Sequence, residues 1–437
     1  MTDAVTKAAA PKQEIGVTGL KVYGGYVQEE FLKRLEGPRG VKVYTEMASN
    51  DATVAAILRA IELMLRPVEW KVEPATDATG ANEGADFAES LMGDMSLTWE
   101  DFISEALTML VYGWSYFETV YKRRVGPEER DPAKRSRYTD GRIGIRKFAP
   151  RSQDSLDRWE MQDDGGIAGM WQADPMGRTP PTLLPIERSL LFRTSTHKGN
   201  PEGRSILRSA YRSWYKLKTI EDVEAVGIER ELAGLPVVRI PAKYLTENDA
   251  ETVRIRQAYE KIARDVKFNE QGGIVIPSDV YLDADGKPSS AYIVDVELLS
   301  TGGARAIDTG AVVMRYQRSI CRSVLADFLM LGTDKGSFAL SENKTDLFLR
   351  SCEVLLDTVA GVLNRYMLTR VWQINALPAE TMPAFRPGRV APVNLDELGK
   401  FLRDAAGAGM PLFPDDELER HVRDQAGLPE KANTGEL

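Results

Sequence analysis

A run of amphipathic sequence from Ser205 to Leu232 constrains the fold of this chain most strongly. Its apolar residues recur every three or four positions over several turns, at Leu207, Tyr211, Trp214, Leu217, Ile220, Val223 and Val226. A helix with such a stripe has to bury it against another element, because a single helix cannot cover its own apolar face. The sequence therefore predicts a long helix with a partner along its whole length.

The size and charge of the chain limit the classes of protein to consider. It has 437 residues, more than one hydrophobic core usually serves, so two or more structural units are expected. Its 65 acidic and 56 basic residues give a net charge of -9 at pH 7. Tight binding of nucleic acid depends on Lys and Arg that neutralise phosphates, so this balance argues against a protein that clamps nucleic acid. It is compatible with a protein through which DNA passes without being held.

Residues typical of catalytic or metal sites are sparse. The cysteines Cys321 and Cys352 lie in apolar helical patterns, and the histidines His197 and His421 are far apart in the sequence. They predict neither a metal cluster nor a disulfide framework. The segment Gly332–Ser337 also differs from a phosphate-binding Walker loop, because its lysine precedes its second glycine and a helix precedes the loop. We predict no catalytic residue, no metal site and no cofactor.

The first 200 residues mix helical and strand-like patterns, which predicts an α+β unit. Asp51 is the expected N-cap of one helix, a second helix begins near Ser96 to Thr98, and the chain turns at Gly113. Strands are predicted at Val68–Pro74, Trp114–Tyr121, Trp159–Met161, Ile167–Trp171 and Leu190–Arg193. The charged segment from Arg123 to Asp140 is expected to be an exposed loop.

The seven tryptophans are spread along the chain, at Trp70, Trp99, Trp114, Trp159, Trp171, Trp214 and Trp372. Platforms that stack nucleic-acid bases need aromatic residues interleaved with a basic groove. Because these tryptophans are not clustered in that way, we expect them to anchor hydrophobic cores.

After Gly203 the pattern changes to long helices around a short β-prone insert. Helices are predicted at Asn248–Val266, Gly303–Phe328, Ser341–Trp372, Leu395–Ala406 and Asp415–Ala426, with Ser341 as an N-cap. Strands are predicted at Leu235–Ile240, Gly273–Ile276 and Tyr292–Leu298.

This order of elements resembles a known family. A Gly203-Arg-Ser-Ile-Leu207 start, a long helix, a short strand closed by Pro241, a charged helix and then a long amphipathic helix are similar to the stem and clip of a tailed-bacteriophage portal protein of the Mu-like subfamily. The resemblance implies an α+β, mainly helical subunit with an α+β wing, two long stem helices and a small α/β clip. The implied divisions are a disordered leader at 1–20, the wing at 21–203, the first stem helix at 204–234, the clip at 235–300, the second stem helix at 301–328, a tunnel loop at 329–345, a long wing helix at 346–375 and a short crown-like region with a tail at 376–437.

The resemblance also implies a function and a set of partners. Subunits would form a closed ring, commonly of twelve, at one capsid vertex, through which double-stranded DNA enters and leaves. The implied partners are the large subunit of the terminase, the major capsid protein, scaffold and head-completion proteins, in the virion and in the host cytoplasm during assembly. No membrane partner is expected, since the longest apolar run, around Ala106 to Phe117, is too short to span a bilayer.

Two sets of site residues follow from the resemblance. The tunnel loop would face the DNA channel with Asp334, Lys335, Gly336, Ser337, Phe338 and Lys344, of which Lys335 and Lys344 would meet phosphates. The clip would meet partner proteins through Arg254, Lys261 and Arg264. Each set also has an ordinary explanation, namely a helix connection with solvated lysines and a charged surface helix.

Other interpretations stay open. Arg315, Arg318 and Arg322 fall on one side of a predicted helix and could face a channel, although a solvated or salt-bridged face is the commoner explanation. The whole chain could also be an enzyme that processes nucleic acid, or a virion adaptor without a channel.

Overall fold

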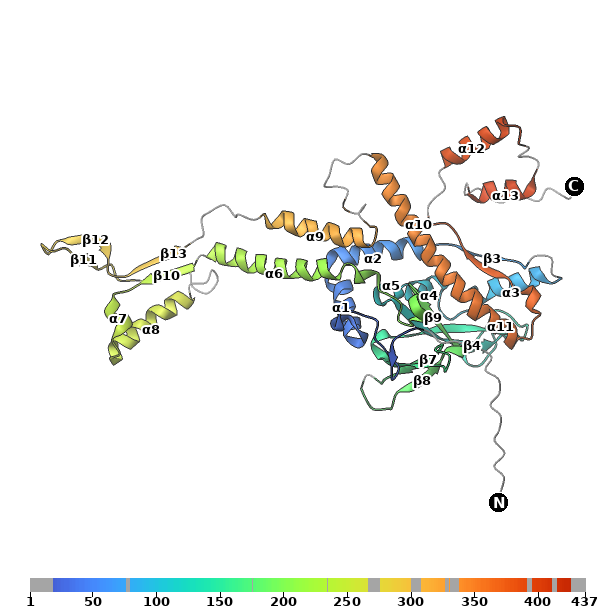
Figure 1. Ribbon diagram of the computed structural model, residues 1–437, viewed down its shortest axis with the longest axis horizontal. Coiled ribbons are helices and arrows are strands. Elements are labelled where there is room, and N and C mark those ends of the chain that lie inside the picture. Colours follow the sequence, from blue (N-terminus) through green and yellow to red (C-terminus); the bar gives the residue numbers. More distant parts are fainter. Residues whose placement is uncertain are drawn as a thin grey trace, which may run out of the picture. The chain divides into compact units, whose positions relative to one another are not determined.

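In the computed structural model, the described residues are 19–75, 79–174, 176–233, 235–265, 276–299, 308–326, 330, 338–390, 395–410 and 415–425. The chain divides into two compact units (Figure 1). The first unit comprises Met1–Ala210 and Ile320–Leu437, and the second comprises Tyr211–Ser319. Helices and small antiparallel sheets make up both units, so the predicted α+β class is confirmed.

The first unit is built around two three-stranded antiparallel sheets, with strand orders β5-β4-β9 and β6-β7-β8. Its strands are β1 Val22–Tyr23, β2 Tyr26–Val27, β3 Trp70–Glu73, β4 Trp114–Arg123, β5 Ile143–Arg151, β6 Leu156–Met161, β7 Ile167–Gln172, β8 Thr182–Pro185, β9 Ser189–Arg193 and β14 Ala384–Pro387. Its helices are α1 Gly37–Asn50, α2 Ala52–Leu65, α3 Ala81–Gly93, α4 Trp99–Ala106, α5 Met109–Tyr112, α10 Phe338–Val362, α11 Thr369–Ile374, α12 Leu395–Gly407 and α13 Asp416–Gln425. The strands predicted from the first 200 residues are all present, and the sequence analysis missed β1, β2, β5 and β8 as separate strands.

The predicted helix starts in this unit are confirmed by their caps. Asp51 accepts a hydrogen bond from the backbone N–H of Val54 at 2.8 Å, and α2 follows it. Thr98 accepts one from Asp101 at 3.1 Å, at the start of α4. Each cap supplies a partner for an N–H group that the first helical turn leaves unpaired.

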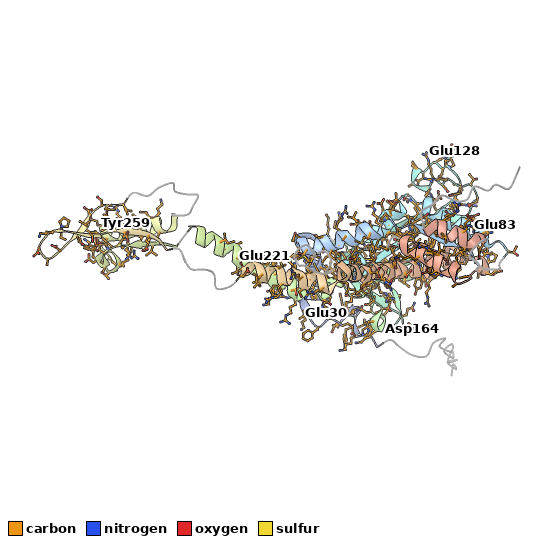
Figure 2. The ribbon with its side chains drawn as sticks, turned by 90° about the horizontal axis from the view of Figure 1, so that it is seen from above. Glu30, Glu83, Glu128, Asp164, Glu221 and Tyr259 are labelled. Carbon is orange, nitrogen blue, oxygen red and sulfur yellow. The ribbon has the colours of Figure 1, made fainter. Side chains whose placement is uncertain are left out.

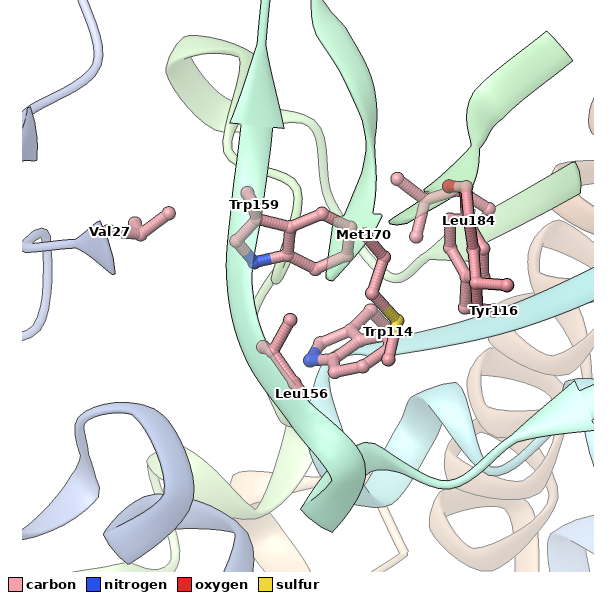
Figure 3. Close-up of a cluster of buried hydrophobic side chains, with 8 residues drawn as sticks. Val27, Trp114, Tyr116, Leu156, Trp159, Met170 and Leu184 are labelled. Carbon is pink, nitrogen blue, oxygen red and sulfur yellow. The ribbon is translucent and has the colours of Figure 1, made fainter. Parts of the chain in front are cut away.

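The sheets meet in an aromatic core, shown in Figure 3. The rings of Trp114 and Trp159 pack edge to face, with centroids 5.2 Å apart. The hydroxyl of Tyr116 donates to the carbonyl oxygen of Leu184 at 2.7 Å, so this buried polar group is satisfied. Five of the seven tryptophans are buried and the other two are half-buried, which confirms that they anchor cores.

Two glycines allow backbones to touch where the chain leaves β9 for the second unit. Gly113 has φ 94°, and a Cβ there would lie 2.4 Å from the carbonyl oxygen of Glu202. Gly203 has φ 57°, and a Cβ there would lie 2.2 Å from the carbonyl oxygen of Gly113. Any side chain at these positions would force the two segments apart. The predicted turn at Gly113 is therefore confirmed.

The carboxyl of Glu202 lies beside the aromatic core. The indole N–H of Trp159 donates to it at 3.2 Å. Burial raises the pKa of the Glu202 carboxyl to about 7, and the nearby Glu36 adds to this shift. The Glu202 carboxyl therefore gains and loses its proton near neutral pH. No pattern in the sequence indicated a buried carboxyl at this position.

The prediction that Arg123 to Asp140 forms an exposed loop is wrong in part. Glu128 is exposed on this connection (Figure 2), but Arg124 and Ser136 are buried. Arg124 donates to the hydroxyl of Ser90 at 2.8 Å and pairs with Asp140 at 3.2 Å. Arg124 thus has a charged partner within the segment and a hydrogen-bond partner on α3, which lets this part of the loop be buried.

A buried ion pair fastens the same connection to the end of α3. The ammonium of Lys122 lies 3.2 Å from the carboxylate of Asp94, and their side chains are 3% and 4% exposed. Asp94 also accepts hydrogen bonds from the Ser136 hydroxyl at 2.7 Å and the Arg137 N–H at 3.0 Å. Lys122 donates in addition to the carbonyl oxygen of Arg135 at 2.7 Å. All of these groups are therefore compensated inside the protein.

Two asparagine side chains late in the chain form hydrogen bonds with strand backbones, as a neighbouring strand would. Asn364, in the π-helical turn Leu363–Leu368, exchanges two hydrogen bonds with the backbone of Phe385, at 2.8 and 3.0 Å. Asn375, just after α11, does the same with Ile143, at 2.7 and 2.9 Å. These amides satisfy backbone groups that would otherwise stay unpaired.

The second unit consists of two long helices and an α/β lobe between them in the chain. Its elements are α6 Tyr211–Ala233, β10 Leu235–Arg239, α7 Ala242–Thr246, α8 Ala250–Asp265, β11 Val280–Leu282, β12 Pro288–Tyr292, β13 Asp295–Leu299 and the part of α9 Thr309–Ser323 up to Ser319. Strand β10 pairs antiparallel with β13, and β11 with β12. The chain therefore enters and leaves the lobe on neighbouring strands.

Several predicted boundaries in this region are wrong. Helix α6 starts at Tyr211, because Ser205 instead caps the 3-10 turn Ile206–Arg208. Helix α9 ends at Ser323, since Leu325 takes a left-handed φ of 61° and the N–H of Ala326 returns to the carbonyl oxygen of Cys321 at 2.9 Å.

The strand and cap predictions beyond Gly203 also need correction. The single strand predicted at Tyr292–Leu298 is two strands, β12 and β13, separated by a bend. Ser341 is not an N-cap, because α10 already begins at Phe338. Of the strand predicted at Gly273–Ile276, only Ile276 is among the described residues, and it is not in a strand.

Candidate functional site

The two long helices of the second unit run antiparallel as a hairpin. Ser213 on α6 and Ser319 on α9 share a hydrogen bond, with their hydroxyl oxygens 3.0 Å apart. Further along, the hydroxyl of Thr309 donates to the carboxylate of Glu224. Since residue numbers rise along α6 and fall along α9 between these two pairs, the helices lie side by side in opposite directions.

Helix α6 changes from buried to exposed along its length. Trp214 and Leu217 are buried, whereas no residue from Glu221 to Ile228 is. Apolar side chains nevertheless continue, and Val223 is 66% exposed, Val226 47% and Tyr215 43%. Helix α9 therefore covers only one side of α6, and within the described residues the predicted partner along the whole helix is incomplete.

Three of the exposed apolar residues of α6, Tyr215, Val223 and Val226, lie on one side of the helix, whereas Ile228, 41% exposed, lies on another. Ser213 and Glu224 mark the side that faces α9, because both bond to that helix. With about 100° of rotation per residue, Tyr215, Val223 and Val226 lie roughly a quarter to a half turn away from that side. A second body would be needed to cover them.

The lobe presents the residues predicted to meet partner proteins. Arg254 and Lys261 are exposed on α8, and so is Glu260. Tyr259, labelled in Figure 2, marks this helix. Arg264 lies near the end of the same helix, and its side chain is outside the described residues.

The residues predicted for the tunnel loop fall into two groups. Asp334, Lys335, Gly336 and Ser337 lie outside the described residues. Phe338 and Lys344 are part of helix α10, so they are not in a loop, and their side chains are not described.

A family model decides what kind of protein this is. The model described as the portal protein of Mu bacteriophage matches residues 41–428, which is most of the chain. The chain belongs to this portal protein family. Portal proteins are structural, so the interpretation of the chain as a nucleic-acid-processing enzyme is set aside.

Two solved structures that align with this portal protein are necks of GTA particles. One chain of the "Neck of empty GTA particle computed with C6 symmetry" aligns with a TM-score of 0.51 and 12% identity, covering 89% of this chain and 94% of that one. A chain of the "Neck of native GTA particle computed with C12 symmetry" aligns with a TM-score of 0.48 and 14% identity, covering 90% and 95%. At 12% identity the first match shows a shared fold. No curated protein sequence matches the chain.

The described residues of the portal protein offer little to metal or redox chemistry. They contain no group of three or more His, Cys, Asp or Glu side chains placed to hold a metal ion. Cys321 and Cys352 are buried and form no disulfide, and burial raises the pKa of the Cys352 thiol to about 11. In the described helices, none is both long enough and apolar enough to cross a membrane.

Basic residues on α6 are a feature of the portal hairpin that the sequence analysis missed. Arg212 and Lys216 are exposed on this helix. On α9, Arg315 is exposed and Arg318, three residues later, is half-buried. The available signal was the absence of any acidic residue from 211–220 and from 309–323.

Proposed function

We propose that this portal protein is the repeating subunit of a ring at one vertex of a phage-like capsid, through which double-stranded DNA is packaged and later leaves. The observation that carries the proposal is the uncovered apolar stripe of Tyr215, Val223 and Val226 on α6. Membership of the portal family supports the ring and its position between head and tail.

A neighbouring copy of the same hairpin would cover this stripe. Each subunit would offer the stripe to a different surface on the next subunit, and such a head-to-tail interface forms a ring when the rotation closes. Burial of three apolar side chains that are now about half exposed would stabilise each interface by a few kcal/mol, at roughly 25 cal/mol for each Å² of apolar surface removed from water. Twelve subunits is the number that the family resemblance implies.

The finer assignment follows the family plan. Residues 21–203 and 346–375 form the wing, 204–234 and 301–328 the stem, 235–300 the clip and 376–437 a short crown-like region. The clip, with Arg254, Lys261 and Arg264, binds the terminase large subunit during packaging and head-completion proteins afterwards. The major capsid protein and scaffold surround the ring, which places the protein in the virion after assembly in the host cytoplasm.

The segment at 329–345 is the channel-facing element, with Lys335 and Lys344 near the DNA. Deletion of 334–339 tests this assignment. It should leave the ring intact and impair DNA retention, whereas loss of assembly would make the segment part of the interface between subunits.

The native mass of the purified chain tests the ring itself. Light scattering should give a mass near a multiple of 48.5 kDa, about twelvefold, and negative-stain images should show annular particles. A monomer or dimer at high concentration would overturn the proposal and favour a virion adaptor without a channel.

A pair of variants tests the observation that carries the proposal. Val223→Glu with Val226→Glu places charge in the stripe and should shift the mass to that of a monomer. Ala225→Glu is the matched control, because Ala225 is exposed on another side of the same helix. If the double variant assembles as well as the control, the stripe is not the interface.

A further inference from the structure

Helix α10 presents an uncharged seam on its exposed side. Leu347 and Val354 are 54% and 61% exposed, and Gly361 is exposed further along the same helix. Ser351 and Thr358, both half-buried, fall between them. The spacing of four, three, four and three residues keeps all five on one side of the helix, as in the seam of a coiled coil. We call Leu347, Ser351, Val354, Thr358 and Gly361 the α10 seam.

The two hydroxyl groups of the α10 seam already have hydrogen-bond partners. Ser351 donates to the carbonyl oxygen of Leu347, and Thr358 donates to that of Val354, each at 2.8 Å. Because these bonds lie within the helix, another helix can cover both hydroxyls without leaving a buried donor unpaired. The α10 seam can therefore pack as an apolar surface.

Gly361 is a poor choice for its position unless another body covers it. Apart from the backbone of its own helix, a Cβ added there would meet nothing of the described protein within 4 Å. The helix does not end at this point, because a π-helical turn, Leu363–Leu368, and then α11 follow directly. Glycine is the weakest helix former after proline, so it weakens the helix here. Close approach of another backbone to Gly361 would account for it.

Helix α12 has an apolar side that could supply this partner. Phe401 is 63% exposed, and Leu398, Leu402 and Ala405 are half-buried. At about 100° per residue these four share one side of α12, while the exposed Arg403 lies on the opposite side. The helix has only 13 residues, and a helix of that length is marginal in water unless it packs against another surface.

The chain holds the start of α12 close to the α10 seam. The backbone N–H of Val390 donates to the carboxylate of Glu353 at 3.2 Å, and Glu353 is next to Val354 in the sequence. Helix α12 begins at Leu395, five residues after Val390, so the connection spans at most about 18 Å. The α10 seam and α12 are also similar in length, about 20 Å each at 1.5 Å per residue.

We propose that α12 packs along the α10 seam of its own chain, with Phe401, Leu398 and Leu402 toward Leu347 and Val354. The short connection makes this contact intramolecular, with an effective concentration in the millimolar range, so a modest apolar contact is sufficient. The contact fastens the C-terminal region to the long helix of the first unit. It does not depend on the proposed ring.

Engineered cysteines in the full chain test the contact. Val354→Cys is combined in turn with Leu398→Cys and Leu402→Cys, which lie on successive turns of α12. At least one pair should form a disulfide under mild oxidation, because facing residues of packed helices come within disulfide range. Val354→Cys with Arg403→Cys is the matched control and should react at least tenfold more slowly. Equal rates in all pairs would overturn the proposal.

The size of the cross-linked product identifies the partner. In denaturing gels without reductant, a disulfide within one chain leaves a species of 48.5 kDa, whereas a disulfide between chains gives a species of twice that mass. A predominant dimer would overturn the proposal in favour of α12 from a neighbouring copy. The native Cys321 and Cys352 are buried, and the unaltered chain measures their background reaction. Since chains are separated before they are measured, a failure of ring assembly does not decide this result.

Hydrogen exchange tests the contact without cross-linking. Val354→Asp places a charge in the α10 seam and should speed exchange of the α12 amides at least tenfold. Asp357→Asn is the control, because Asp357 is exposed on α10 outside the seam, and it should leave α12 unchanged. The amides of α10 show whether each variant keeps its fold. Unchanged exchange in α12 while α10 stays protected would refute the contact.

Discussion

Removal of Lys122 should loosen the connection between β4 and β5 while leaving the rest of the fold in place. Lys122→Met keeps the length of the side chain but leaves the Asp94 carboxylate buried without its cation, 3.2 Å from where the ammonium was. Loss of one partner from a buried ion pair costs about 3 to 5 kcal/mol. Asp94 would retain its hydrogen bonds from Ser136 and Arg137, which favours the lower end of that range, about 3 kcal/mol.

Native-state hydrogen exchange is the suitable assay, because a chain of two units need not unfold in one step. A loss of about 3 kcal/mol in local opening free energy corresponds to roughly hundredfold faster exchange of the amides between 124 and 140. Lys134→Met is the control on the same connection, since its side chain is 59% exposed and its ion pair with Asp131 should contribute less than about 1 kcal/mol.

A double-mutant cycle shows whether the ion pair is responsible. Lys122→Met combined with Asp94→Asn should cost less than the sum of the single changes, by about 0.5 to 3 kcal/mol, because the unpaired charge is gone. Exchange in Lys122→Met within threefold of the wild type, or costs that simply add, would refute the reasoning.

Three other predictions follow from buried groups of the first unit. The pKa of the Glu202 carboxyl is raised from about 4.5 to about 7, so its charged form opposes folding. Between pH 4.5 and 7, the free energy of unfolding of the wild type should fall by about 3 kcal/mol more than that of Glu202→Gln. Denaturant titration at each pH measures this difference, and parallel pH profiles would contradict it. Gly113→Ala should destabilise the protein by more than about 1 kcal/mol, because its Cβ would lie 2.4 Å from a carbonyl oxygen, while Gly93→Ala, with nothing within 4 Å, should be close to neutral in thermal melts. Asn375→Leu should cost about 1 to 3 kcal/mol by leaving both backbone groups of Ile143 unpaired, and unchanged exchange of that amide would show that the bonds contribute nothing.

Local signals in the sequence predicted many elements of the first unit. Asp51 and Thr98 mark helix starts because their short side chains accept hydrogen bonds from the next turn, a preference that depends on neighbouring residues alone. Gly113 marks a turn because only glycine adopts its backbone conformation without strain. The aromatic and β-branched run that became β4 is a similar local signal.

The errors occurred where distant residues decide the structure. The segment 123–140 looked exposed because it is charged, yet Asp94, which lies 42 residues before Ser136, accepts hydrogen bonds from Ser136 and Arg137 inside the protein. Ser341 looked like a helix cap, but α10 begins three residues earlier, so the serine lies within the helix. The pairing of Asn364 and Asn375 with strand backbones likewise depends on residues far away in the chain, as does the raised pKa of Glu202.

The stem region shows both contributions together. The sequence by itself determined that α6 is amphipathic and needs a partner, because apolar spacing at the helical period is a property of the chain alone. Only the tertiary structure decided that α9 lies antiparallel to it and that Tyr215, Val223 and Val226 stay exposed. Burial and charge pairing depend on which surfaces meet in space, and a pattern along one segment does not contain that information.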